Sequence, residues 1–200
     1  PDMVRQLNLC PPEVLSAADS LRFRNTILVF LEIDSSDIFP DQWIYVHSNL
    51  LKTGRITNFR NWVPGITNGK RSTILCFEYW CFEQDSLWRT STPELVALAK
   101  EELNTLFPQK KMNVLNGHVI KLSKSYPVYE MGYQAKIEVI KKHLQKFSNL
   151  YVIGRYGSFK YNNQDHSILM GLIAADRISN RSQVDLWGIN SDYETYQESG

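Results

Sequence analysis

The strongest constraint on the fold lies near the end of this 200-residue chain, between residues 150 and 178. An apolar run at residues 150–153 stops at Gly154. Apolar side chains then recur with helical spacing over residues 168–178, and Asp165 or Ser167 can serve as the cap. This pattern predicts a strand, a tight loop and a helix. Because a helix N-terminus presents unpaired backbone N–H groups, it favours a polar or anionic ligand, and the segment therefore predicts half of a cofactor site.

Earlier in the chain, several apolar, β-rich runs of strand length predict an antiparallel sheet. Loops with turn-forming residues join these runs, which is the usual arrangement when consecutive strands pair with one another. The strand candidates are residues 26–33, 43–47, 54–59 and 72–80, and residues 113–123 also have an extended pattern.

Helical patterns alternate with these runs. A short helix is predicted at residues 13–21, and longer amphipathic helices at residues 92–106 and 133–144. Since an apolar helical stripe must be buried, we expect the two longer helices to cover one face of the sheet. The sequence thus predicts an α+β fold.

Composition and charge exclude several classes of protein. A formal net charge of +1 gives no electrostatic basis for binding nucleic acid. The three cysteines and four histidines show no metal-ligand spacing, so no metal site is predicted. No apolar stretch reaches the roughly 20 residues of a membrane span, and no signal peptide is visible. The prediction is a cytoplasmic, globular protein.

The segment after residue 153 resembles the closing motif of FAD-dependent enzymes of the amine oxidase, protoporphyrinogen oxidase and UDP-galactopyranose mutase superfamily. The residues that carry the resemblance are Gly154, Arg155, Gly157, Phe159, Tyr161, Asn162, Asn163 and Asp165. In that superfamily the final strand and helix return from the substrate domain to the FAD domain, and the start of the helix lies against the flavin. The resemblance implies FAD as the cofactor, contacted by Gly154, Arg155, Asn163, Asp165, His166 and Ser167.

The same resemblance divides the chain. It implies a substrate-binding domain at residues 1–148, the closing strand and helix of a Rossmann-like FAD domain at 149–180, and a tail at 181–200. None of the ten glycines forms the G-x-G-x-x-G turn that holds a dinucleotide pyrophosphate. We therefore interpret the chain as a C-terminal fragment whose N-terminal FAD domain is missing. Alone, it is expected to be inactive and to lose FAD, and its exposed surface can mediate self-association.

Five residues are candidates for binding a small-molecule substrate. A guanidinium can bind a diphosphate with paired hydrogen bonds. The resemblance to the mutases implies that Arg155, Tyr126 and Tyr161 lie beside the substrate diphosphate. Tyr129 can line the same pocket, and Arg55 can hold an anionic substrate from a strand. The structural alternatives are arginines paired with acids and tyrosines that pack between elements. No catalytic residue is assigned.

Three functions remain open. The first is the substrate-binding portion of an amine-oxidase-like oxidoreductase, in which hydride passes to flavin N5. The second is a UDP-galactopyranose-mutase-like isomerase of nucleotide sugars, although the mutase pattern has an acid where this chain has Asn163. The third is a non-catalytic module that binds a glycan or a nucleotide without flavin.

Overall fold

The computed structural model describes residues 1–7 and 10–189, and the chain forms two compact units. The sheet unit is Arg24–Ser125, and the helical unit joins Pro1–Phe23 to the chain from Tyr126 onwards. This division differs from the expected boundary at residue 148. Residues 126–148 group with the C-terminal segment because α6 (Tyr133–Leu144) packs against α2 (Pro12–Asp19). The assignment of either part to a substrate-binding or an FAD domain stays a prediction.

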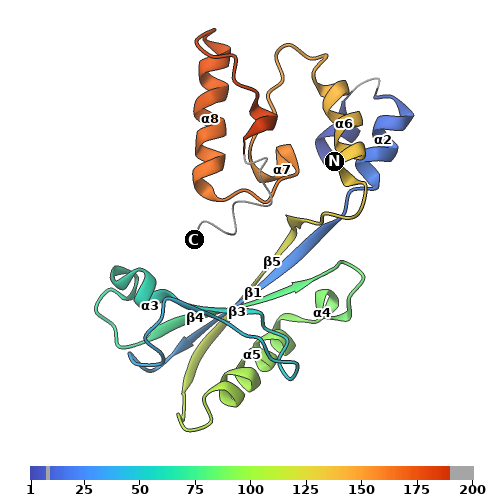
Figure 1. Ribbon diagram of the computed structural model, residues 1–200. Coiled ribbons are helices and arrows are strands. Elements are labelled where there is room, and N and C mark those ends of the chain that lie inside the picture. The colour runs from blue at the N-terminus through green and yellow to red at the C-terminus, as the bar shows by residue number, and fades with distance from the viewer. Residues whose placement is uncertain (8–9, 190–200) are drawn as a thin grey trace. The chain divides into compact units, whose positions relative to one another are not determined.

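The sheet has five strands in the order β2-β3-β4-β1-β5 (Figure 1). The neighbouring pairs β2/β3, β3/β4 and β4/β1 are antiparallel. The strands are β1 (Phe23–Ile33), β2 (Trp43–Tyr45), β3 (Arg55–Asn58), β4 (Thr73–Cys81) and β5 (Val114–Pro127). All five correspond to predicted runs, so the α+β class with a largely antiparallel sheet is confirmed.

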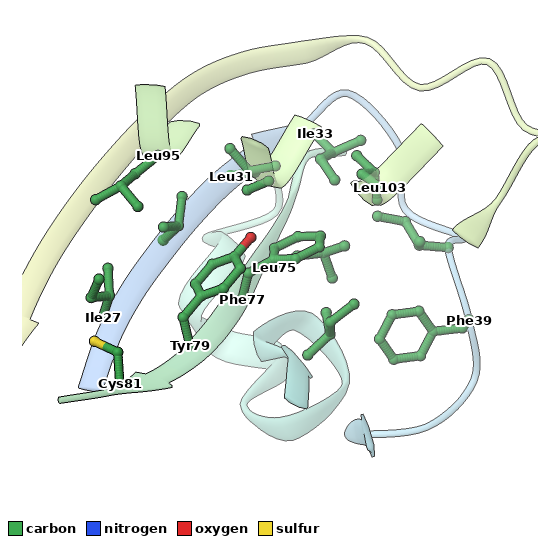
Figure 2. Close-up of a cluster of buried hydrophobic side chains, with 14 residues drawn as sticks. Ile27, Leu31, Ile33, Phe39, Leu75, Phe77, Tyr79, Cys81, Leu95 and Leu103 are labelled. Atoms are coloured by element: carbon green, nitrogen blue, oxygen red, sulfur yellow. The ribbon is translucent and has the colours of Figure 1, made fainter. Parts of the chain in front are cut away.

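The core of the sheet unit lies between the sheet and α5 (Thr92–Leu106). Alternate side chains of β1 lie on the same face of the sheet. Figure 2 shows Ile27, Leu31 and Ile33 on the side of Leu95 and Leu103. All five are fully buried. Burying an aliphatic side chain of this size contributes roughly 1.5–3 kcal/mol, so this interface supplies much of the unit's stability.

Polar contacts fix the N-terminal end of α5 and its register on the sheet. Ser91 caps the helix and forms a capping box with Glu94. Further along, the buried Glu102 carboxylate accepts hydrogen bonds from the Tyr79 hydroxyl at 2.9 Å and the Lys52 backbone N–H at 2.5 Å. A buried charge with these donors is satisfied, and it ties α5 to both β4 and the loop before β3.

Short helices complete the sheet unit. The side chain of Asn58 caps α3 (Phe59–Trp62), which is followed by the 3₁₀ turn η1 (Pro64–Thr67). A further single turn, α4 (Ser86–Arg89), precedes α5.

The helical unit contains α1 (Asp2–Gln6), α2, α6, α7 (Gly154–Ser158), α8 (Gln164–Ile178) and the 3₁₀ turn η2 (Leu186–Gly188). Its larger core joins side chains of α1, α2 and α6 to Phe159. Leu186 fills a smaller core under α8 with Met170 and Ala174. The prediction that the helix at 133–144 covers the sheet is therefore wrong, because its apolar stripe is buried within the helical unit.

The strand predicted at residues 150–153 is not formed. A strand requires a neighbour that accepts its ladder of hydrogen bonds, and none of the described residues provides one here. The apolar side chains are nevertheless used, since Leu150 and Val152 pack against the larger helical core. Helix α8 also begins earlier than predicted, at Gln164, and its cap is Asn163 rather than Asp165 or Ser167.

Candidate functional site

Arg155, Tyr126 and Tyr161 meet in the helical unit and form what we call the guanidinium–tyrosine cluster. The two rings stack with centroids 5.2 Å apart and planes 22° from parallel. The Arg155 guanidinium carbon lies 4.8 Å from the Tyr126 centroid and 4.9 Å from the Tyr161 centroid. Each guanidinium–ring contact of this kind stabilises by about 0.5–1 kcal/mol when exposed. Arg155 and Tyr161 follow Tyr126 by 29 and 35 residues in the sequence, and the fold brings the three side chains together.

The turn after α7 brings the Asn162 carbonyl back to Arg155 and holds the guanidinium in place. Arg155 donates to the backbone carbonyl of Asn162 through Nε at 3.1 Å and a terminal nitrogen at 2.7 Å. Gly154 has φ of +74°, a conformation that a residue with a Cβ rarely adopts, so glycine is needed where the chain enters α7. A backbone carbonyl of the same turn therefore orients the Arg155 guanidinium.

Tyr129 holds the backbone of the guanidinium–tyrosine cluster through a hydrogen bond. Its hydroxyl accepts a hydrogen bond from the backbone N–H of Tyr161 at 2.6 Å. Its ring stacks on Tyr133 at a centroid distance of 4.6 Å and contacts the buried Phe159 at 6.2 Å. The hydroxyl thus fixes the backbone of Tyr161, a residue that is 49% exposed.

Lys160 is a residue that the sequence analysis missed. Its side chain is 6% exposed, and its ammonium donates to the backbone carbonyls of Trp187 and Ile189, the latter at 2.6 Å. Burial lowers the pKa of the Lys160 ammonium, and the charge of Asp185 acts in the opposite direction. A lone lysine between two aromatic residues gives no sequence signal of burial.

The start of α8 is organised by Asn163 and His166. The Asn163 side chain accepts from the backbone of the third helical residue, and the Asn163 N–H donates to His166 Nδ1 at 3.4 Å. His166 Nδ1 also lies 3.2 Å from the Asp165 carboxylate. Ser167 donates to the Asn163 carbonyl at 3.2 Å. These predicted flavin contacts share one helix start, where backbone donors favour an anionic group.

Arg55 belongs to the sheet unit and is paired there. Its Nε and a terminal nitrogen donate to the two carboxylate oxygens of Glu78 at 2.7 and 2.8 Å. The Glu78 side chain is 7% exposed and that of Arg55 is 30% exposed. The guanidinium also lies 5.9 Å from the Tyr45 ring. This two-point pair gives Arg55 a structural partner that neutralises its charge, so its role toward a substrate stays a prediction.

The described residues contain no group of three or more His, Cys, Asp and Glu side chains able to hold a metal ion. None of the helices among these residues is long and apolar enough to cross a membrane.

Comparison with solved structures shows that the fold resembles parts of larger proteins. Reduced UDP-galactopyranose mutase superposes with a TM-score of 0.68 at 19% identity, over 84% of this chain and 36% of the mutase. A protein from Exiguobacterium sp. 255-15 described as a protoporphyrinogen oxidase gives 0.58 at 16% identity, over 76% of this chain and 34% of that protein. An oxidoreductase from Methanosarcina mazei gives 0.52 at 14% identity, over 82% and 36%.

The chain thus spans about a third of the length of these structures. The likeness confirms the predicted fold resemblance to this group of proteins. Neither the comparison with protein-family models nor that with curated proteins gives a match.

Proposed function

We propose that this chain is the substrate-binding portion of an FAD-dependent enzyme whose substrate carries a diphosphate. The observation that carries the proposal is the guanidinium–tyrosine cluster, in which a cation lies against two aromatic rings. Arg155 is half-buried and the Tyr161 ring is exposed, so an incoming anionic group can reach the cluster. A guanidinium binds phosphate oxygens at two points, and the tyrosine rings lower the local dielectric around that contact.

Between the two enzyme chemistries, the cluster favours an isomerase of nucleotide sugars resembling UDP-galactopyranose mutase. The neutral amide of Asn163 favours the other, an amine-oxidase-like oxidoreductase, because the mutase pattern has an acid there. In both cases the roles of this chain are binding and orientation: Arg155 neutralises the diphosphate, and Tyr126 and Tyr161 flank it.

FAD fits this chain in part. The dinucleotide-binding glycine turn is not in the sequence, so another part of a longer protein would hold the pyrophosphate. The residues available here are Gly154 at the entry to α7 and the polar start of α8, Asn163 to Ser167. When bound, FAD would supply the redox or nucleophilic chemistry at N5.

The exposed apolar side chains of α8 support the proposal that another domain packs against this helix. Three of its apolar side chains, Ile168, Leu172 and Ile178, are 62–64% exposed. An exposed apolar stripe on one helix is typical of a surface that packs against another domain or a second copy. We accordingly expect the 200-residue chain purified alone to carry no flavin absorbance. A yellow preparation with bound FAD would contradict the proposal that another part of a longer protein holds the FAD pyrophosphate.

Titration with uridine diphosphate, followed by ¹H–¹⁵N NMR, tests the diphosphate assignment. We expect shift changes at Arg155 and Tyr161, affinity lowered about tenfold or more in Arg155→Ala, and partial recovery in Arg155→Lys because a point charge cannot reproduce the planar fork. Arg22→Ala is the matched control, since Arg22 belongs to the same unit and pairs with Glu130 on the surface. Absence of UDP-induced shifts in the wild-type chain, or equal affinities for wild type and Arg155→Ala, would refute the assignment.

A further inference from the structure

The C-terminal strap, residues 182–189, is fastened to the helical unit at several points. Arg177 of α8 donates to the carbonyls of residues 183 and 184 at 3.2 and 2.7 Å. The Lys141 ammonium of α6 lies 3.7 Å from the Asp185 carboxylate and 5.7 Å from the Trp187 ring centroid. These contacts hold the strap against two helices that are far apart in the sequence.

Lys160 makes a further cationic attachment, and it differs from Arg177 and Lys141 in being buried. Its ammonium donates to the carbonyls of Trp187 and Ile189, which are both strap residues. A buried ammonium must keep its acceptors, because a cation without hydrogen bonds in a nonpolar environment is strongly destabilised. The strap therefore supplies the hydrogen bonds that allow Lys160 to stay inside the helical unit.

The backbone of Lys160 belongs to the turn that shapes the guanidinium–tyrosine cluster. Its N–H donates to the Arg155 carbonyl at 3.1 Å, and its own carbonyl accepts from the Asn162 N–H at 2.9 Å. The next residue is Tyr161, whose ring stacks on Tyr126. Lys160 thus joins the strap through its side chain to the cluster through its main chain.

We propose that Lys160 is a positioning residue, which uses the C-terminal strap as an anchor to hold Arg155 and Tyr161 in the geometry of the cluster. Its consequence for ligand binding rests on the proposed function, whereas the positioning itself does not. Without the strap carbonyls, the flexible lysine would turn its charge to solvent, and the backbone from Phe159 to Asn162 would move with it. The strap is then part of the architecture of the binding site.

Amide hydrogen exchange at Tyr161 measures this positioning directly, because that N–H donates to the Tyr129 hydroxyl. In Lys160→Met, which removes the charge-assisted bonds, we expect exchange at Tyr161 to accelerate about tenfold or more. Lys160→Arg keeps a cation with several donors and should recover most of the protection. Wild-type exchange at Tyr161 in Lys160→Met would overturn the proposal.

Arg177→Met is the matched control, since it removes the hydrogen bonds from α8 to the carbonyls of residues 183 and 184 while Leu186 stays packed under α8 and the turn is untouched. It should leave Tyr161 protected as in the wild type, and an equal acceleration would mean general loosening and overturn the role of Lys160. If Lys160→Met does not give a dispersed spectrum, Lys160→Gln is judged by the same criterion.

Titration with UDP separates this inference from the proposed function. If wild type binds UDP, Lys160→Met should weaken binding about tenfold, equivalent to about 1.4 kcal/mol, and unchanged binding would overturn the effect on the site. If wild type does not bind UDP while Tyr161 exchange still accelerates in Lys160→Met, the proposed function fails and the positioning role stands.

Discussion

Removing the Arg55 side chain tests whether this arginine is chiefly structural. In Arg55→Met, the Glu78 carboxylate, whose side chain is 7% exposed in the wild type, loses both of its guanidinium contacts. A carboxylate stranded in this way costs about 3–5 kcal/mol of the free energy of unfolding, well above the roughly 0–1 kcal/mol of an exposed pair. The structure therefore predicts a large loss of stability from a residue that the sequence assigned to substrate binding.

The double variant Arg55→Met, Glu78→Leu sharpens this prediction. Since replacing a buried ion pair with apolar side chains is often close to neutral, the double variant should be more stable than Arg55→Met alone. Urea unfolding followed by tryptophan fluorescence measures all three proteins, because four of the five tryptophans belong to the sheet unit. If Arg55→Met unfolds at the wild-type urea concentration, the pair does not stabilise the sheet and the reasoning is wrong.

Three further predictions test other parts of the fold. Gly54→Ala should destabilise the sheet unit by about 1–3 kcal/mol, since a Cβ there would come within 2.1 Å of the indole of β4, whereas Gly65→Ala meets nothing within 4 Å and should unfold like the wild type in urea. Side-chain and backbone hydrogen bonds from Ser91 lower the pKa of Glu94, so their stabilisation should be present above the carboxyl's unfolded pKa and fade as pH falls through the lower folded value. Ser91→Ala removes the hydroxyl donor and keeps the backbone donor, and should therefore reduce this pH dependence in thermal unfolding curves. Cys10 alone should react with a thiol reagent in the folded chain, because the other two cysteines are buried and their pKa values raised; rapid labelling of all three would contradict the packing.

Local patterns in the sequence were sufficient to predict most of the elements. Period-two and helical periodicities depend on which side chains can share one face, and they located β1, β4, β5 and α5 within a few residues. The same reasoning failed at residues 150–153, because an apolar run indicates burial without specifying a partner. Leu150 and Val152 are partly buried against helices while Ile153 is exposed, and no strand pairs with these residues in the part of the chain that the structure describes.

The chemistry of the candidate site was decided by tertiary structure to a larger extent. Motif resemblance identified Arg155, Tyr126 and Tyr161 as residue types suited to one site, but their stacking depends on the turn that follows α7. Neither the pairing of Arg55 with Glu78 nor the burial of Lys160 could be predicted, because each depends on a partner remote in the sequence. The sequence by itself determined which side chains could bind an anion. The fold decided which cations already have partners, since the cost of burying a charge is set by the groups that surround it.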